Sequence, residues 1–211
     1  MLKAIVFDYG KVLTLPPTPE DWSRLALCFD ASVEYLQKPY WRWRDMYDRA
    51  QLNAESYWTA VAHDLGRKLT REGIQHLTQL DNTQWMNINP EMLEFAWRAQ
   101  DAGLKIAVLS NMQLDMLAAM RRNFAWLARF DAQIYTCEIG AVKPEPEAYN
   151  AALKGVGTSA EDSLFLDDKQ VNIDGARAVG MQAQLFEGDI LSAYEAVDRL
   201  GKPLAVRETA E

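Results

Sequence analysis

The sequence predicts an α/β fold in which a parallel β-sheet carries helices on both faces and an inserted bundle of helices. Two observations predict it. From residue 89 onward, short apolar runs alternate with stretches of helical periodicity, as in parallel sheets with right-handed crossovers. Between residues 15 and 88, helical periodicity continues without a strand signal. We therefore expect a core domain formed by residues 1–14 and 89–211, and a helical domain, the cap, formed by residues 15–88.

Short apolar runs predict the strands of the sheet. The first run, Leu-Lys-Ala-Ile-Val-Phe, stops at Asp8-Tyr9-Gly10, and each later run follows a helical stretch. The predicted strands cover residues 2–7, 104–109, 133–137, 163–166 and 182–186.

Capping signals predict where the core helices begin and end. Asn89 before Pro90 is typical of a helix start, and Gly103 ends that helix. Gly180 ends a later one in the same way. The polar tail after Lys202 is expected to be frayed. The other predicted core helices cover residues 112–122, 144–154, 170–179 and 190–200.

The cap is predicted from apolar side chains at helical spacing. Pro16, Pro17 and Pro19 break the backbone after the first strand, and helical periodicity follows. Side chains that recur every three or four residues share one helix face, and we expect them to pack inside the cap. They are Trp22, Leu25, Ala26 and Phe29; Tyr40, Trp43 and Tyr47; and Tyr57, Ala60, Val61 and Leu65.

Composition narrows the range of partners. The chain has 211 residues and a formal net charge of −8, so no overall positive field attracts nucleic acid or an anionic membrane. No apolar run approaches the roughly 20 residues of a membrane span, and the N-terminus lacks a signal-peptide profile. Cys28 and Cys137 have no zinc or disulfide spacing, and we expect both to be buried as small apolar residues. These features predict a cytoplasmic protein whose partner is a small molecule, with no nucleic acid or membrane among its partners. We expect a monomer or homodimer, although composition does not distinguish the two.

Four polar segments stand where predicted strands end or helices begin. They are Asp8, Ser110-Asn111, Lys143 before Pro144, and Asp167-Asp168. The carboxyl ends of parallel strands share one edge of a sheet, and ligands bind in the crevice there. We therefore expect the four segments to converge, although more than 150 residues separate the first from the last.

These residue types suit metal-assisted phosphoryl transfer. A carboxylate such as Asp8 can attack phosphorus and divide one difficult displacement into two easier ones. Asp167 and Asp168 repel each other unless a cation binds, and Mg²⁺ prefers carboxylate and carbonyl oxygens. Asp8, one aspartate of this pair and a carbonyl near Gly10 would form such a site. The simpler alternative for Asp8 is a turn residue.

The remaining segments offer positive charge and hydrogen bonds to phosphate. Lys143, with its backbone restrained by Pro144, would neutralise the nucleophile and the phosphoryl oxygens; its alternative is a solvated surface lysine. Ser110-Asn111 is expected both to cap a helix that starts at Met112 and to bind phosphate there. Asn172 and Asp174 either orient this site or are ordinary residues of a first helical turn.

The ordered set of four segments resembles the motifs of the haloacid dehalogenase-like hydrolase superfamily. The resemblance covers nearly the whole chain, because residues 15–88 look like the four-helix cap of that family. It implies a Rossmann-like core. Two of the motifs also look like those of the phosphatase domain of mammalian soluble epoxide hydrolase and of bacterial phosphatases of sugar 1-phosphates. The motifs are Phe7-Asp8-Tyr9-Gly10-Lys11-Val12-Leu13, Leu109-Ser110-Asn111, Val142-Lys143-Pro144-Glu145-Pro146 and Phe165-Leu166-Asp167-Asp168, with Asn172 and Gly175 behind the last.

The family resemblance implies a role for each motif residue. Asp8 would be the nucleophile, and Mg²⁺ would be bound by Asp8, the Gly10 carbonyl and Asp168, with support from Asp167. Ser110, Asn111 and Lys143 would bind the phosphoryl group, and Ser110 and Lys143 would also act in catalysis. The implied reaction is Mg²⁺-dependent hydrolysis of small phosphomonoesters, such as sugar 1-phosphates, through an aspartyl-phosphate.

The first motif departs from the family at Gly10. Most phosphatases of the family carry an aspartate there as the general acid for the leaving alcohol. Three alternatives follow: the substrate has an intrinsically good leaving group, an acid comes from the cap (His63, Asp45 or Glu55), or the site is degenerate and only binds phosphate. The first is preferred, because the bacterial sugar 1-phosphate phosphatases resemble this chain in having glycine there.

Three other points leave alternatives open. Lys11 stands where the family usually has glycine or asparagine, and it either adds positive charge near the phosphate or points to solvent. A metal-independent haloacid dehalogenase is the alternative enzyme, although those relatives usually have serines in place of Asp167-Asp168. The run Trp41-Arg42-Trp43-Arg44 resembles a nucleic-acid surface, but helical spacing favours packing in the cap, with Trp41, Arg42 or Arg44 lining a substrate cavity.

Overall fold

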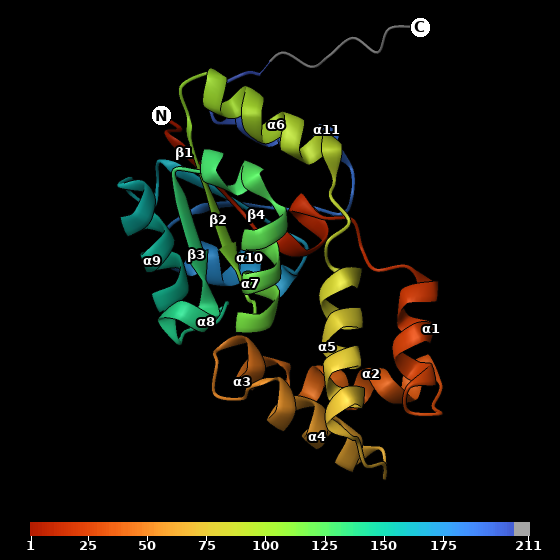
Figure 1. Cartoon of the computed structure of the whole chain (residues 1–211). Helices are drawn as coiled ribbons and strands as arrows, with labels where there is room; N and C mark the ends of the chain where they lie inside the picture. The colour runs from red at the N-terminus through yellow and green to blue at the C-terminus, as the bar shows by residue number, and fades with distance from the viewer. Residues whose placement is uncertain (205–211) are drawn as a thin grey trace, which may run out of the picture.

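A parallel sheet with the strand order β3-β2-β1-β4-β5 forms the centre of the molecule (Figure 1). The structure is a computed structural model, and it describes residues 1–204. The five predicted strands are confirmed with small shifts at their ends, and the tail predicted after Lys202 lies outside the described residues from residue 205 on. The strands are β1 (Ala4–Phe7), β2 (Lys105–Ser110), β3 (Ala132–Tyr135), β4 (Ser163–Asp167) and β5 (Gln182–Leu185).

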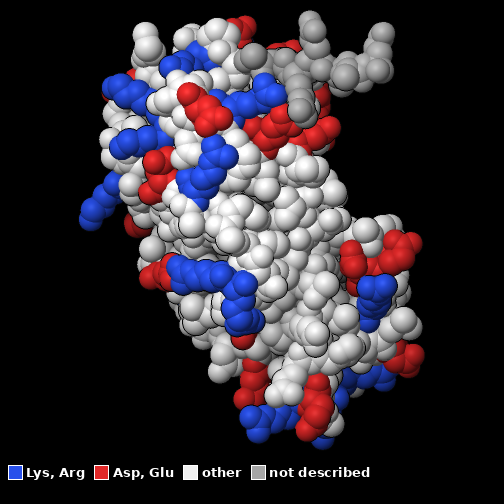
Figure 2. Space-filling view, turned by 45° about the horizontal axis from the view of Figure 1, so that its top comes forward, with Lys and Arg blue, Asp and Glu red and all other residues white. Residues whose placement is uncertain are grey.

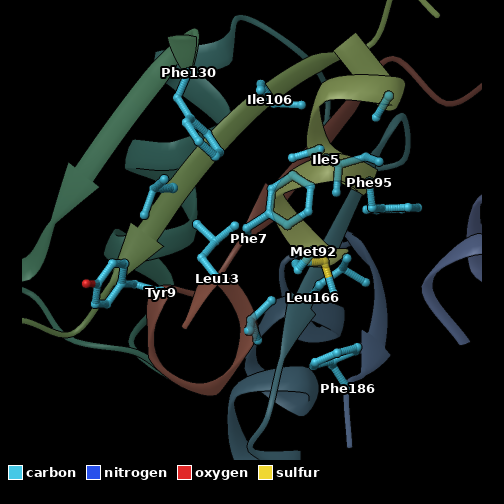
Figure 3. Close-up of a cluster of buried hydrophobic side chains, with 14 of the residues drawn as sticks. Ile5, Phe7, Tyr9, Leu13, Met92, Phe95, Ile106, Phe130, Leu166 and Phe186 are labelled. Carbon is cyan, nitrogen blue, oxygen red and sulfur yellow. The ribbon is translucent and has the colours of Figure 1, made fainter. Parts of the chain in front are cut away.

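Helices cover both faces of the sheet because its strands are apolar on both sides. Side chains alternate along β1, so Ile5 and Phe7 belong to one buried cluster and Ala4 and Val6 to the other. Figure 3 shows Phe7 in the first cluster, where its ring lies edge-on to that of Phe95, with 6.1 Å between centroids. The first cluster includes α6 (Pro90–Asp101), α7 (Leu114–Asn123) and α11 (Ile190–Arg199), and the second includes α9 (Pro146–Val156) and α10 (Gln170–Ala178).

Two core helices begin later than predicted. The helix predicted from Met112 begins at Leu114, because the Met112 N–H donates to Thr136 Oγ1 (3.0 Å) and Gln113 takes the N-cap position. Ser110-Asn111 is therefore not the cap of this helix. The helix predicted from Pro144 begins at Pro146. Three short elements were not predicted: a π-helical turn over Tyr9–Leu13, α8 (Thr136–Ile139) and a 3₁₀ turn over Ala125–Arg129.

The cap residues form helices with a buried cluster of their own. Most of the predicted inward-facing side chains are buried, but Trp22, Trp43 and Ala60 are only partly buried. Cys28 is exposed, so its predicted burial is wrong, whereas Cys137 is buried. The helices are α1 (Pro19–Leu27), α2 (Val33–Arg42), α3 (Arg44–Asp48), α4 (Ala54–Asp64) and α5 (Arg71–Gln84).

Two neighbouring chain segments connect the cap to the core. Thr14 and Ile88 form an isolated antiparallel bridge. On either side of it, Leu15 N–H donates to Asn87 O (2.7 Å) and Asn89 N–H donates to Leu13 O (3.0 Å). This pairing supports the division at residues 14/15 and 88/89, which stays a prediction. Figure 1 shows the cap helices gathered at one end of the molecule.

The surface carries charges of both signs. On the face shown in Figure 2, lysine and arginine side chains are interspersed with aspartate and glutamate around a broad uncharged area. Among the described residues, every helix falls short of the length and apolar character that a membrane span requires.

Candidate active site

Asp8 stands at the carboxyl end of the central strand. In the sheet register Phe7 pairs with Val108 of β2 and with Leu166 of β4, and the Asp8 N–H donates to Leu166 O (2.8 Å). The next positions on the neighbouring strands therefore lie beside Asp8. This register brings the ends of the first, second and fourth predicted segments to one edge of the sheet.

Lys143 completes the convergence. Its ammonium donates to Asp8 Oδ1 (2.6 Å) and to Asp167 Oδ2 (2.7 Å), and its side chain is 1% exposed. Asn111 holds the backbone of this loop, because its Oδ1 accepts from the Lys143 N–H (2.9 Å) and its Nδ2 donates to Lys143 O (3.1 Å). The surface alternative for Lys143 is therefore wrong: the side chain is buried between two carboxylates.

Asp167 and Asp168 differ in their surroundings. Asp167 is fully buried, and its Oδ1 accepts from the Lys169 N–H (2.8 Å) and from Asn172 Nδ2 (2.9 Å). Asn172 thus orients Asp167, whereas Asp174 pairs with exposed groups on its own helix. Asp168 is partly exposed and pairs with Lys11.

Asp8, Asp167 and Asp168 form a cluster that suits a hard divalent cation. One carboxylate oxygen from each lies within 4.8 Å of the others. Asp167 is already hydrogen-bonded at both oxygens, so Asp8 and Asp168 have more free lone pairs for an ion. With the ammonium groups of Lys143 and Lys11, the cluster has a formal charge of −1, which a divalent cation changes to +1. The donor set therefore fits Mg²⁺ together with a phosphate anion.

Burial dominates the electrostatics of Asp8. It raises the pKa of the Asp8 carboxyl from 3.8 to about 7; the Lys143 ammonium acts to lower this pKa, and the charges of Asp167 and Asp168 act to raise it. Burial also acts to lower the pKa of Lys143, but Asp167 and Asp8 outweigh it, so the pKa of Lys143 is raised. Lys143 therefore stays charged.

A cavity of about 370 Å³ lies between this edge of the sheet and the cap. From the core, Asp8, Gly10, Ser110, Asn111 and Lys143 line it, together with Asp168. The cap contributes residues of three kinds, aromatic, basic and acidic. They are Trp41, Trp85, Arg44, Asp45 and Asp48.

The lining of the cavity distinguishes among the three cap residues that the sequence offered as a general acid. Asp45 lines it, as one of the three sequence alternatives for a general acid, whereas Glu55 and His63 line a separate hollow beside α4. Asp48 lines the cavity as well and was not predicted. The sequence feature that could have identified Asp48 is its position one helical turn after Arg44. Burial raises the pKa of Asp48 to about 6, opposed by the Arg44 guanidinium.

Arg44 is a buried connection between cap and core, not part of a basic surface. Its Nε donates to Asp48 Oδ1 (2.9 Å), its Nη1 donates to Asp81 Oδ2 (3.0 Å), and its Nη2 donates to Gln113 Oε1 (2.7 Å) in the loop after β2. Arg42 instead pairs with Asp64 on the outside of the cap. Because Arg44 is buried and Arg42 is paired with Asp64, the run does not form the basic face that the nucleic-acid interpretation requires.

Trp85 packs over Gly10, the position at which the family resemblance leads one to expect a general acid. Gly10 has ordinary extended backbone angles (φ −69°, ψ 125°), so a side chain is sterically allowed by the backbone. A Cβ built there would lie 3.5 Å from Trp85 Cζ3, in van der Waals contact. The Trp85 ring thus covers Gly10, and this position supplies no carboxyl group to the cavity.

Gly175 of α10 packs tightly against the Lys143 loop. A Cβ there would lie 2.8 Å from Pro144 Cβ and 2.8 Å from the Tyr149 hydroxyl oxygen. We expect Gly175→Ala to lower the free energy of unfolding by about 1–3 kcal/mol because the loop must shift. Gly73→Ala, at a helical glycine with room for a methyl group, is the control, and we expect a change of less than about 1 kcal/mol. Equal chemical-denaturation midpoints for the two variants would contradict this close packing.

The family follows from comparison with known sequences. The sequence model of the haloacid dehalogenase-like hydrolase family matches residues 2–180. The chain belongs to this family. Membership confirms the predicted resemblance and makes the protein a hydrolase of the haloacid dehalogenase-like family.

Named relatives of this hydrolase include enzymes of different activity. Phosphatase MT3486 of Mycobacterium tuberculosis is 28% identical over 197 residues, 88% of each chain. Bifunctional epoxide hydrolase 2 of Mus musculus is 33% identical over 101 residues, 45% of this chain and 18% of that protein. An (S)-2-haloacid dehalogenase of Xanthobacter autotrophicus is 27% identical over 188 residues, 85% of this chain and 73% of that protein.

A solved structure confirms the fold. A haloacid dehalogenase-like family enzyme of Bacteroides thetaiotaomicron, crystallised with magnesium and inorganic phosphate, superposes with a TM-score of 0.70. It is 17% identical in sequence, and the match covers 90% of this chain and 96% of that one. The predicted α/β class and Rossmann-like core are thereby confirmed.

Proposed function

We propose that this hydrolase is a Mg²⁺-dependent phosphatase of small phosphorylated metabolites, with Asp8 as the nucleophile. The observation that carries the proposal is the contact of the Lys143 ammonium with both Asp8 and Asp167, beside Asp168, in one cavity. The relative named a phosphatase and the neighbour that holds magnesium and phosphate support it.

Each residue has a role in the proposed reaction. An Asp8 oxygen attacks phosphorus, the bond from phosphorus to the leaving oxygen breaks, and water then hydrolyses the aspartyl-phosphate. Lys143 balances the charge on Asp8 and on the phosphoryl oxygens. Asp167 orients Lys143, while Ser110 and Asn111 line the phosphoryl position.

Magnesium would be held by Asp8, the Gly10 carbonyl and Asp168. When bound, it supplies positive charge to the phosphoryl oxygens. The site as it stands has one net negative charge among Asp8, Asp167, Asp168, Lys11 and Lys143, so it would repel a phosphate dianion without the cation.

The absence of an acid at Gly10 favours substrates with good leaving groups. An alkoxide leaves slowly when no group protonates it, whereas the anomeric oxygen of a sugar 1-phosphate, an acyl oxygen or an aryl oxygen leaves more easily. We therefore propose sugar 1-phosphates as one substrate class. The cytoplasmic location and the monomeric or homodimeric state remain predictions.

The proposal is tested by measuring phosphate release from p-nitrophenyl phosphate and a panel of sugar 1-phosphates. We expect release with Mg²⁺ and its loss in EDTA, restored by added Mg²⁺. Absence of Mg²⁺-dependent release from every compound would overturn the proposed function.

A second prediction concerns the leaving group. We expect kcat/KM for an alkyl phosphate to be about 10²–10⁴-fold below that for p-nitrophenyl phosphate, the usual contribution of general acid catalysis. Gly10→Asp is expected to reduce the difference between these two kcat/KM values, because the new carboxyl group can protonate the leaving oxygen. A Cβ at this position fits against Trp85. Equal rates for alkyl and aryl phosphates in the unmodified protein would show that another group, such as Asp45 or Asp48, protonates the leaving oxygen.

Two observations keep other functions in view. The Xanthobacter relative favours a metal-independent dehalogenase, which would release chloride from 2-chloropropionate in EDTA. Gly10 favours a phosphate-binding protein with weak catalysis, in which Asp8 would be labelled by a reactive phosphate compound in one burst without turnover.

A further inference from the structure

Lys11 is held in an unfavourable backbone conformation with its side chain at the carboxylate cluster. Its φ angle is 61°, in the left-handed region that side-chain-bearing residues rarely adopt. Its ammonium lies 3.1 Å from Asp168 Oδ2, and it lines the cavity. The Lys11 N–H donates to Thr14 Oγ1 (3.3 Å), and the side chain is 42% exposed.

The two lysines of the cluster have different freedom to move. Lys143 is 1% exposed and is held by two carboxylates and by the Asn111 amide through its backbone. Within residues 1–204, Lys11 pairs with one carboxylate, that of Asp168, and its side chain is partly exposed. Its ammonium can therefore exchange partners within the cavity, whereas that of Lys143 cannot without leaving a buried carboxylate unpaired.

Asp168 is the residue for which a cation and Lys11 compete. Under the proposed function it is a cation ligand, and its oxygen already accepts the Lys11 ammonium. An ion that binds Asp168 must displace this ammonium or tolerate its charge at close range. A phosphate group beside the ion offers the displaced ammonium a new anionic partner.

We propose that Lys11 couples cation binding to phosphate binding. Without phosphate its ammonium occupies Asp168 and weakens the cation site; with phosphate it transfers to the phosphoryl oxygens. The cation and the phosphate group then strengthen each other's binding, and the coupling is reciprocal. This inference rests on the proposed function.

Lys169 provides the matched control. It follows Asp168 directly and lines the same cavity, but its ammonium lies over the Trp41 ring, 5.4 Å from the centroid. Replacing either lysine with methionine removes the same formal charge from the same cavity. A general effect of charge would appear in both variants, whereas an effect of the Asp168 contact would be larger in Lys11→Met.

The test is isothermal titration calorimetry of Mg²⁺ into each protein, with and without inorganic phosphate. For Lys11→Met we expect the Mg²⁺ Kd without phosphate to fall roughly fivefold or more, within the usual range of coupling between sites. The ratio of Mg²⁺ Kd values without and with phosphate is expected to fall below that of the unmodified protein, while the direct attraction between the cation and phosphate keeps it above one. Lys169→Met and Lys11→Arg are expected to keep the ratio of the unmodified protein.

Each result decides the inference. Unchanged Mg²⁺ affinity in Lys11→Met, or the same change in Lys169→Met, would overturn it while leaving the proposed phosphatase intact. If the unmodified protein binds neither Mg²⁺ nor phosphate, both this inference and the proposed function are wrong. Lys11→Gly removes the charge and relieves the positive φ, so it serves if Lys11→Met does not fold, and the same Kd changes are expected.

Discussion

Asp8→Asn is expected to lower Mg²⁺-dependent phosphate release by about 10³-fold or more, because the amide cannot form the aspartyl-phosphate. The substitution keeps the shape of the side chain, so Lys143 retains its contact with Asp167. Phosphate release at saturating Mg²⁺ measures the loss. Asp174→Asn, at an exposed carboxylate of α10, is the control and should retain activity.

The same variant has a pH-dependent effect on stability. The pKa of the Asp8 carboxyl is 3.8 when unperturbed and about 7 in the fold, chiefly because of burial. Between these pH values Asp8 binds more protons in the folded state than in the unfolded state. Its contribution to the free energy of unfolding therefore falls as the pH rises from about 4 to 7. In EDTA, Asp8→Asn should therefore unfold at a higher temperature than the unmodified protein at pH 8, with the difference vanishing near pH 4. A constant difference across this range would contradict the raised pKa of Asp8.

Lys143→Met is expected to reduce both activity and stability. Activity should fall about 10²–10³-fold, because the phosphoryl oxygens lose a fixed positive charge. The free energy of unfolding in EDTA at pH 8 should fall by about 3–5 kcal/mol, because Asp8 and Asp167 are left buried without a cationic partner. Chemical denaturation measures the second effect, with the surface variant Lys154→Met as the control.

The origin of this loss is tested by a double variant. Adding Asp8→Asn to Lys143→Met removes one of the two unpaired carboxylates, so part of the stability should return while activity stays absent. If Asp8→Asn changes the free energy of unfolding by the same amount in Lys143→Met as in the unmodified protein, the two effects are independent and charge pairing does not explain the loss.

The strands and the convergent segments were predicted from local sequence. Each strand is an apolar run bounded by polar residues, and the edge where Asp8, Lys143 and Asp167 meet follows from parallel connections. Helix ends were predicted less well. The starts expected at Met112 and Pro144 moved by two residues, because long-range hydrogen bonds to Thr136 and Asn111 hold those loops.

Burial and partner choice in the site depended on the packing of cap against core. Arg42 and Arg44 looked alike as members of one basic–aromatic run, but Arg44 is buried on Asp81 and Gln113, whereas Arg42 pairs with Asp64 on the outside of the cap. Asp48 was missed because its neighbourhood in the cavity comes from segments far along the chain. Residue spacing also did not predict which cap residue lines the cavity. Of the three alternatives Asp45, Glu55 and His63, only Asp45 lines it.

The order of apolar runs and polar segments alone determined the α/β class, the edge that carries the site and the identity of Asp8 as its central carboxylate. Tertiary structure alone decided the pairing of Lys11 with Asp168 and the cover of Trp85 over Gly10. The physical reason is distance along the chain. Strand formation and connection depend on short-range pattern, whereas ion pairs and side-chain contacts depend on which distant surfaces fold together.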